Sequence, residues 1–311
     1  IFKEAQYKEG FNPIDQDNFP SELFRFQSSD VRCQCLHLPS PTAQRIINKA
    51  SVVEEFKGLI HYFSQHGQKE RLLIFNLQDR TSWKEHARAD CLEKLQNEAD
   101  MKEHLTVVTL AKHTDFYFQS DEYLMNNDAT SFKTQLLEQV KSGRTCGFYF
   151  PQSVNHKDLF QFTEKAIDAI HQCFFGGKNV LTRKNRLDFI EIFYQLIQLK
   201  IIFLIKPTYM SFSCKDGVDV GASAALGLYG FLKLLHKELT WSEEEKDLIL
   251  RIIFAPALLI RERNIEIQRL SRIVSVLALI NSERDVHKNS VIDLAKELLA
   301  PYRVDNLDVF N

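Results

Sequence analysis

Short β-favouring runs alternate with longer segments of helical periodicity along most of this sequence, and that alternation limits the fold more than any other feature. The runs are rich in apolar, β-branched or aromatic residues, and charged or turn-forming residues bound them. Strands are expected at residues 71–77, 104–111, 146–150 and 208–212. Helices between them are expected at residues 82–97, 129–141, 157–174 and 183–205. The pattern favours an α/β fold with a mostly parallel central sheet flanked by helices.

The two ends of the chain differ from this alternating part. Residues 1–42 combine proline, asparagine, aspartate and serine with scattered phenylalanines, which predicts an irregular N-terminal arm. The α/β core is expected over residues 43–239, and it would open with a helix over residues 43–65. Residues 240–311 predict an all-helical C-terminal appendage packed on the core. We therefore expect one α/β unit with an arm before it and helices after it.

Composition excludes several functional classes. A net charge of −2 over 311 residues gives no reason to expect nucleic-acid binding. No apolar run reaches membrane-spanning length, so we expect a soluble protein. The ten histidines and six cysteines show no metal-ligand spacing, and a glycine-rich nucleotide motif is lacking, so we expect neither a metal nor a cofactor. Because the chain begins with isoleucine, we expect it to be part of a longer protein.

The stretch from Tyr209 to Ser223 is the best candidate for a functional site. A short β-favouring run precedes Cys214, a turn with two glycines follows it, and a helix is expected from Ala222 to Leu239. A loop that leads from a strand into a helix can bind an anion, because the first N–H groups of the helix have no intrahelical partner. The helix dipole would also favour the thiolate form of a cysteine there. The alternative is a buried structural cysteine at the end of a strand.

This stretch resembles the phosphate loop of the cysteine-dependent phosphatases, in which a cysteine is followed by five residues and an arginine. It is most similar to the phosphoinositide branch, which includes the Sac-type lipid phosphatases and the inositol-phosphate phosphatases secreted by intracellular bacterial pathogens. Loops of that branch read Cys-Lys-x-Gly-x-Asp-Arg or Cys-x-Asp-x-x-Asp-Arg. The residues that match one or both versions are Cys214, Lys215, Asp216, Gly217 and Asp219. Val220 stands at the position of the family arginine, and valine cannot bind phosphate oxygens as a guanidinium does.

The resemblance implies a protein-tyrosine-phosphatase-like fold and a role for each residue of the loop. Cys214 would be the nucleophile that forms a phosphocysteine. Lys215 would lower the pKa of that cysteine and contact an additional phosphate. The backbone would cradle the reacting group, from Asp216 through Gly217, Val218, Asp219 and Val220 to Gly221.

Two further residues are expected at the same edge of the sheet, because ligands gather beyond the carboxyl ends of parallel strands. Asp115 follows the strand at 104–111 and could be the general acid. Asp216 and Asp219 could serve as the acid instead. The alternative for Asp115 is that it belongs to a solvated turn. Arg80 follows the strand at 71–77 and could contact phosphate, or it could form an ion pair with Asp79 or Glu85.

A second group of basic residues lies far from this loop in the sequence. After Gly176 and Gly177, four of them fall within nine residues, namely Lys178, Arg183, Lys184 and Arg186. Such a cluster could dock an anionic membrane surface or a lipid headgroup, and the alternative is a solvated loop.

Two functions remain open at this point. The first is a phosphatase-like domain of a bacterial effector that binds a phosphoinositide, an inositol phosphate or phosphate at the Cys214 loop, with impaired or absent catalysis because of Val220. Its resemblance implies delivery to the host cytoplasm or to the surface of host membranes. The second is a scaffold for host proteins in which the loop is vestigial.

Overall fold

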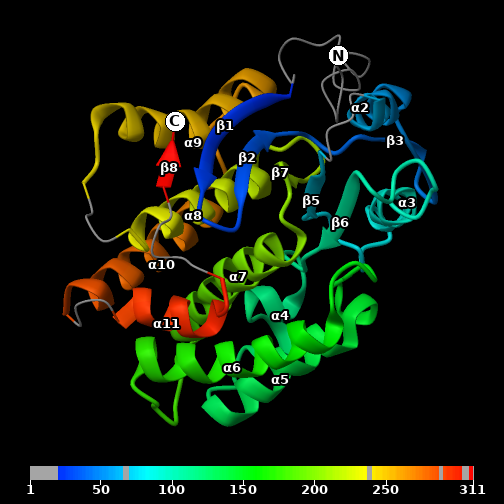
Figure 1. Cartoon of the computed structure of the whole chain (residues 1–311). Helices are drawn as coiled ribbons and strands as arrows, with labels where there is room; N and C mark the ends of the chain where they lie inside the picture. Colours follow the sequence, from blue (N-terminus) through cyan, green and yellow to red (C-terminus); the bar gives the residue numbers. More distant parts are fainter. Residues whose placement is uncertain (1–19, 66–69, 237–239, 287–289, 303–307, 311) are drawn as a thin grey trace.

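In the computed structural model, the described residues are 20–65, 70–236, 240–286, 290–302 and 308–310. Their largest feature is a six-stranded sheet in the order β6-β5-β7-β2-β1-β8 (Figure 1). The strands are β6 (Leu105–Thr109), β5 (Leu72–Asn76), β7 (Tyr209–Ser213), β2 (Arg32–His37), β1 (Ser21–Gln27) and β8 (Asp308–Phe310). The first four are mutually parallel, whereas β1 and β8 pair antiparallel. The predicted α/β fold with a mostly parallel sheet is therefore confirmed.

Helices cover both faces of the sheet, and alternate residues of β5 show how. Leu72 and Ile74 face a core built with α2 (Glu54–Gln65) and α3 (His86–Leu95). Leu73 and Phe75 face the opposite, larger core. This alternation follows from the period of two along a strand. A strand buried on both faces needs apolar residues at nearly every position, as β5 has.

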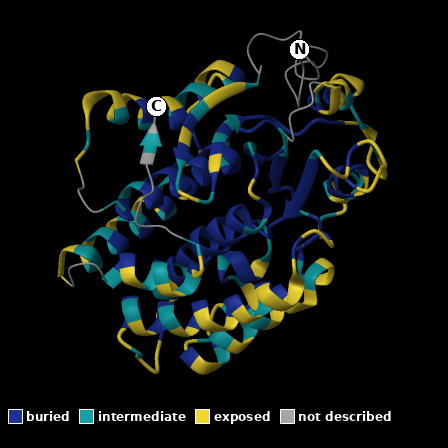
Figure 2. Ribbon diagram, in the orientation of Figure 1, coloured by how far each residue is buried: buried dark blue, intermediate teal, exposed yellow. Residues whose placement is uncertain are grey.

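The larger core is built around a long central helix, α7 (Arg183–Ile205), which is buried along most of its length (Figure 2). Thr182 and Asn185 form a capping box that starts this helix where the sequence predicted it. Around it lie α5 (Ala129–Ser142), α6 (His156–Phe175), α8 (Asp219–Leu234), α10 (Ile267–Val286) and α11 (Ser290–Leu299). The remaining long helix, α9 (Glu243–Arg261), packs mainly on α8 and continues through Pro256.

The N-terminal region departs from the sequence prediction. Of the expected irregular arm, residues 1–19 lie outside the described residues, and the rest forms β1, β2 and the start of a hairpin. Phe24 and Phe26 of β1 and the two cysteines of β2, Cys33 and Cys35, point into the core. These buried residues alternate with polar ones, which is the pattern of a β-strand. The sequence prediction missed this pattern because the region as a whole is rich in polar and turn-forming residues.

Three other elements also differ from expectation. The expected helix at 43–65 is a hairpin of β3 (Thr42–Ile46) and β4 (Lys49–Val52) followed by α2, and Ile46 and Ile47 are exposed at its tip. The expected strand at 146–150 is a short 3₁₀ turn, η3 (Gly143–Cys146), followed by a single bridge between Tyr149 and Thr109 of β6. The C-terminal region is not all-helical, because β8 joins the sheet beside β1. The bridge at Tyr149 and the pairing of β8 depend on partners distant in sequence, whereas β3 and β4 pair within one hairpin.

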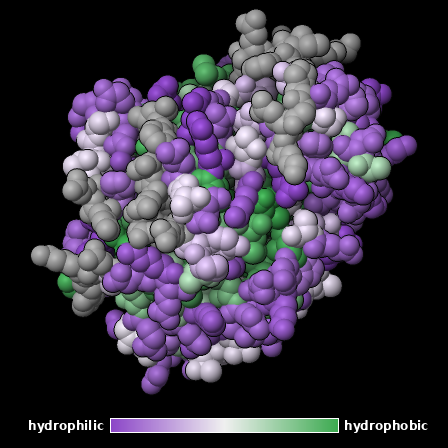
Figure 3. All heavy atoms as spheres, viewed as in Figure 1, coloured by the Kyte–Doolittle hydropathy of each residue, from purple (hydrophilic) through white to green (hydrophobic). Residues whose placement is uncertain are grey.

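The surface in this view is mainly hydrophilic, and hydrophobic residues show in a hollow near its centre (Figure 3). Among the described helices, none has the length and apolar character needed to cross a membrane.

Candidate functional site: the Cys214 loop

The loop after β7 is short and closely packed. It covers residues 214–218, and α8 begins at Asp219, three residues before the predicted start. A Cβ atom at Gly221 would lie 2.6 Å from the carbonyl oxygen of Phe212, so glycine allows the helix to approach the strand. Gly217 has a φ of +76°, and a Cβ there would lie 2.6 Å from the ring of His37. The sequence therefore folds into the strand–loop–helix unit that the two glycines predicted.

Cys214 lies at the bottom of this unit as a thiol. Burial, and then the negative charge of Asp216, raise the pKa of Cys214 to about 12. The backbone N–H groups of Gly221 and Gly217 interact with the sulfur and lower this pKa only in part. The side chain is 7% exposed. The predicted thiolate is therefore not supported, because desolvation outweighs the helix N-terminus.

The carboxylates of the loop are paired with arginines from the C-terminal helices. Asp216 lies 2.5 Å from Nε of Arg261, the last residue of α9. Asp219 accepts hydrogen bonds from Arg263 at 2.6 Å and 3.0 Å and from the backbone N–H of Glu266 at 2.8 Å. Burial alone would raise the pKa of Asp219, but Arg263 and the N–H of Glu266 outweigh it and hold this pKa below its usual value. The loop is thus tied to the connection between α9 and α10.

Sequence reasoning missed these arginines. They lie 45 and 44 residues from their carboxylate partners. The local signal was the run Arg261-Glu262-Arg263, which follows the apolar part of a predicted helix. Basic side chains at this position predict the C-terminal end of the helix, where they interact favourably with the helix dipole.

Other strand ends contribute to the same edge of the sheet. The backbone N–H of Ser40, which follows β2, donates to the carbonyl of Cys214 at 2.9 Å. The charge of Glu85, after β5, acts on Cys214, and the charge of Asp79 acts on His113, which follows β6. The carboxyl ends of four parallel strands therefore meet here, as the topology requires.

Val220 is the second residue of α8 and is 7% exposed. Its backbone carbonyl accepts a hydrogen bond from the hydroxyl of Ser223 at 3.1 Å. Lys215 is partly buried in the loop. The position that holds arginine in the resembling family is therefore occupied by an apolar side chain within the core.

Arg80 is turned toward α3 rather than toward the loop. Its Nε donates to both carboxylate oxygens of Glu93, at 2.9 Å and 3.0 Å, and its side chain is 8% exposed. Arg80 forms an ion pair, but its partner is Glu93 and neither of the two carboxylates expected from the sequence, Asp79 and Glu85. In this position Arg80 joins the turn after β5 to the middle of α3.

Asp115 is the first residue of α4 (Asp115–Phe118) and is exposed. Thr114 caps this short helix, and the hydroxyl of Ser120 donates to Asp115 at 3.1 Å. Among the described residues, no interaction joins Asp115 to the Cys214 loop. Its surroundings are those of a solvated turn.

No protein-family model, no curated protein and no solved structure matches this chain. Within the described part of the chain, no three His, Cys, Asp or Glu side chains are grouped so that they could hold a metal ion.

Proposed function

We propose that this chain is a phosphatase-like domain of a bacterial effector, related to phosphoinositide phosphatases, that binds phosphate or a phosphorylated inositol headgroup at the Cys214 loop without turning it over. The observation that carries the proposal is the state of Cys214: a buried thiol on a strand–loop–helix unit, with the N–H groups of Gly217 and Gly221 directed at its sulfur. A protein-tyrosine-phosphatase-like arrangement of the sheet and delivery to the host cytoplasm or host membranes belong to the same proposal.

The lack of turnover follows from the nucleophile. With a pKa of about 12, roughly one Cys214 in 10⁵ would be a thiolate at neutral pH. Val220 adds no positive charge that would stabilise the transferring phosphoryl group. Both conditions for cysteine-dependent phosphoryl transfer are therefore missing.

Binding has better support than catalysis. Arg261 and Arg263 bring two guanidinium groups to a loop that lacks its own arginine, and Lys215 adds a third positive charge. A phosphate at the loop would compete with Asp216 and Asp219 for these arginines, so we expect weak binding that increases as the two carboxylates are neutralised.

The experiment measures phosphate release and binding separately. We expect no release of phosphate from phosphatidylinositol phosphates by the wild-type chain, by Cys214→Ser or by Val220→Arg, because the thiol stays protonated in each chain that retains it. We expect Lys215→Gln to weaken binding of inositol phosphates at the loop, and Lys246→Gln, an exposed lysine on α9, to leave it unchanged. Turnover that is lost in Cys214→Ser would contradict the first part, and equal affinities in the two lysine variants would contradict the second.

A second candidate function rests on exposed apolar residues in the C-terminal helices. Leu250 and Leu258 of α9 are 53% and 51% exposed, and they lie two helical turns apart on one face. Val274 of α10 is also exposed. Such residues favour a scaffold that binds a host protein. A host protein that cross-links to the wild-type chain but not to a Leu250→Glu/Leu258→Glu variant, with headgroup binding unchanged, would support this function over the first.

A further inference from the structure

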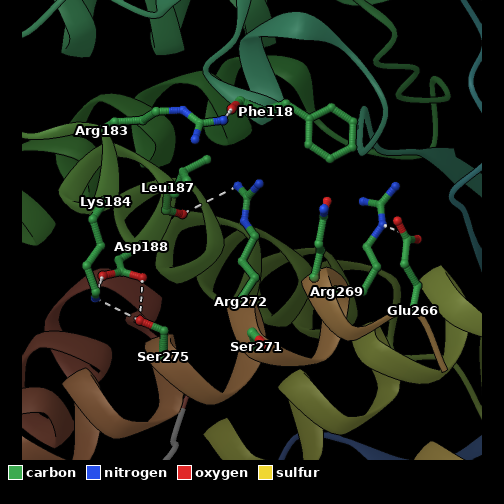
Figure 4. A pocket seen from close by; sticks show the side chains of 11 residues that line it. Phe118, Arg183, Lys184, Leu187, Asp188, Glu266, Arg269, Ser271, Arg272 and Ser275 are labelled. Atoms are coloured by element: carbon green, nitrogen blue, oxygen red, sulfur yellow. Dashed lines mark hydrogen bonds and ion pairs between the residues drawn. The ribbon is translucent and has the colours of Figure 1, made fainter. Parts of the chain in front are cut away.

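A cavity of about 450 Å³ opens between α4, the first turns of α7 and the first half of α10 (Figure 4). We call it the α10 pocket. Its lining includes Phe118, Arg183, Lys184, Leu187, Arg269 and Arg272. This volume lies within the range of small-molecule sites in proteins. The basic residues come from two helices that are far apart in the sequence, and two of them belong to the basic cluster noted after Gly177.

The base of the α10 pocket contains more buried positive than negative charge. Arg269 and Arg272 have side chains that are 7% and 10% exposed, and Lys112, packed beside them, is 2% exposed. Lys112 and Arg272 contact the buried carboxylate of Glu191, which is 0% exposed and lies 3.0 Å from each of them. Burial alone would raise the pKa of Glu191, but Lys112 and Arg272 outweigh it and hold this pKa below its usual value. Lys112 and Arg272 therefore share one buried anion, and Arg269, buried beside them, has its ion-pair partner in Glu266.

The other acidic residues at the α10 pocket do not remove this excess. Glu266 lies 3.4 Å from Arg269, and its side chain is 49% exposed. Asp188 pairs with Lys184 at 2.6 Å, at the side of the pocket. The lining as a whole has four basic side chains and two carboxylates. Because buried charge without a counter-charge is costly, this arrangement favours a bound anion.

Neutral acceptors orient the guanidinium groups without cancelling their charge. Arg272 donates to the carbonyl of Tyr117 at 2.8 Å, and its guanidinium lies 3.8 Å from the centre of the Tyr117 ring. Arg183 donates to the carbonyls of Phe118 and Gln119 at 2.9 Å and 3.0 Å. Among the described residues, Arg183 has no carboxylate partner. The end of α4 thus fixes two guanidinium groups, which extend toward the same gap (Figure 4).

We propose that the α10 pocket binds a small molecule that carries two or more phosphate groups on a compact ring, either free in solution or as the headgroup of a membrane lipid. Arg269 and Arg272 would contact one phosphate group at the base, and Arg183 and Lys184 would contact another at the mouth. Phe118 and Leu187 supply an apolar wall for the ring. This site is separate from the Cys214 loop, and it does not depend on the function proposed for that loop.

The test is a calorimetric titration of the whole chain with myo-inositol hexakisphosphate. We expect saturable binding whose affinity falls at least about tenfold in an Arg183→Gln/Lys184→Gln variant, because each residue would make a charged hydrogen bond. Both side chains are exposed, so the variant should fold as the wild type does. An Arg183→Lys variant keeps the charge without the guanidinium fork, so its affinity should lie between that of the wild type and that of the double variant.

The matched control is a Lys141→Gln/Lys246→Gln variant, which removes two exposed positive charges on α5 and α9. Its affinity should equal that of the wild type. A loss as large as in the Arg183→Gln/Lys184→Gln variant would show diffuse attraction and overturn the proposal. Absence of binding would also overturn it.

A second comparison separates the α10 pocket from the Cys214 loop. Lys215→Gln should leave binding at the α10 pocket unchanged; if Lys215→Gln removes all binding and the Arg183→Gln/Lys184→Gln variant removes none, the ligand belongs to the loop and the pocket proposal fails. Sedimentation with phosphatidylcholine vesicles, with and without phosphatidylinositol bisphosphate, then identifies the source. Binding to the phosphorylated vesicles that needs Arg183 and Lys184 indicates a headgroup, and binding of the soluble compound alone indicates a free metabolite.

Discussion

The Cys214 loop and the α10 pocket are neighbouring regions that differ in charge balance. In the loop, each carboxylate meets an arginine, with Asp216 on Arg261 and Asp219 on Arg263. In the α10 pocket, Arg272 and the adjoining Lys112 share the buried carboxylate of Glu191, and the buried Arg269 pairs with the half-exposed Glu266. A sequence motif pointed to the first region and a basic cluster to two residues of the second, Arg183 and Lys184, but only the folded arrangement brings α10 beside them. The difference teaches that paired charges compete with a ligand, so we expect an anion to bind more weakly at the loop than at the α10 pocket, whose basic side chains outnumber its carboxylates.

Two histidines report the same difference. Burial is the main reason why His37, at the loop, and His113, at the pocket, each have a pKa lowered to about 4. The next contribution differs in sign: Asp216 raises the pKa of His37, and Arg269 lowers the pKa of His113. The loop is therefore acidic on the side of His37, and the α10 pocket is basic on the side of His113.

The largest effect is expected from removing the shared carboxylate of the α10 pocket. Glu191→Gln would leave Lys112 and Arg272 buried without their counter-charge, so the free energy of unfolding should fall by about 3–5 kcal/mol. Urea denaturation measures the change. Glu164→Gln, which removes an exposed partner of Lys141, is the control and should cost less than about 1 kcal/mol. Similar losses in the two variants would contradict the account of the buried charges.

A smaller loss is expected from disturbing the packing of the loop. Gly221→Ala would place a Cβ 2.6 Å from the carbonyl of Phe212, and the shift of α8 needed to avoid it should destabilise the fold by about 1–3 kcal/mol. Gly58→Ala is the matched control, because a Cβ there would meet no atom of the described residues within 4 Å and alanine favours the helix α2. Thermal unfolding should therefore move down for Gly221→Ala and slightly up for Gly58→Ala.

Breaking one ion pair of the loop should have a modest effect on stability. Asp219→Asn weakens the contacts with Arg263 and Glu266 and removes a negative charge from the first turn of α8, for a combined loss of about 1 kcal/mol. The same change frees the charge of Arg263, so phosphate binding at the loop should increase. Weaker phosphate binding in Asp219→Asn would contradict competition between the carboxylate and the ligand.

The smallest expected effects are changes in the pKa values of the two histidines, which NMR titration measures. Asp216→Asn should lower the pKa of His37, whereas Arg269→Gln should raise the pKa of His113. Both histidines are neutral in the folded chain until about pH 4 but gain a proton near pH 6.5 in the unfolded chain. Stability that is complete above about pH 6.5 should therefore be lost as the pH falls toward about 4. Shifts of the same sign in the two variants would contradict the opposite signs of the charges that act on the two histidines.

The sequence predicted the elements whose own pattern determines them. The capped helix α7 and the buried strands β5 and β6 lie close to their predicted positions. It failed where pairing between strands decides: β1 and β2 depend on each other and on β7, and the exposed hairpin of β3 and β4 contains isoleucines that had been assigned to a helix face. Local pattern cannot separate these cases, because short strands obtain their stability from cross-strand neighbours.

The candidate site was predictable to a similar degree. The strand, the glycine turn and the helix around Cys214 could be predicted, because backbone geometry demands those residue types. The sequence could not predict that Cys214 is protonated, because its pKa is raised mainly by burial, which only the folded chain shows. Nor could it predict the placement of Arg80 on Glu93, since several carboxylates lie within reach along the sequence.

The pairing of β8 with β1 has a consequence for synthesis of the chain. Arg25 lies opposite Phe310, so the sheet reaches its full width only after 285 further residues have been made. Until then β1 presents an unpaired backbone edge, which is a surface on which strands of other nascent chains can assemble. A ribosome-bound chain should accordingly depend on chaperone protection longer than its early-folding parallel strands would suggest, and a truncation after Leu299 should remain prone to aggregation.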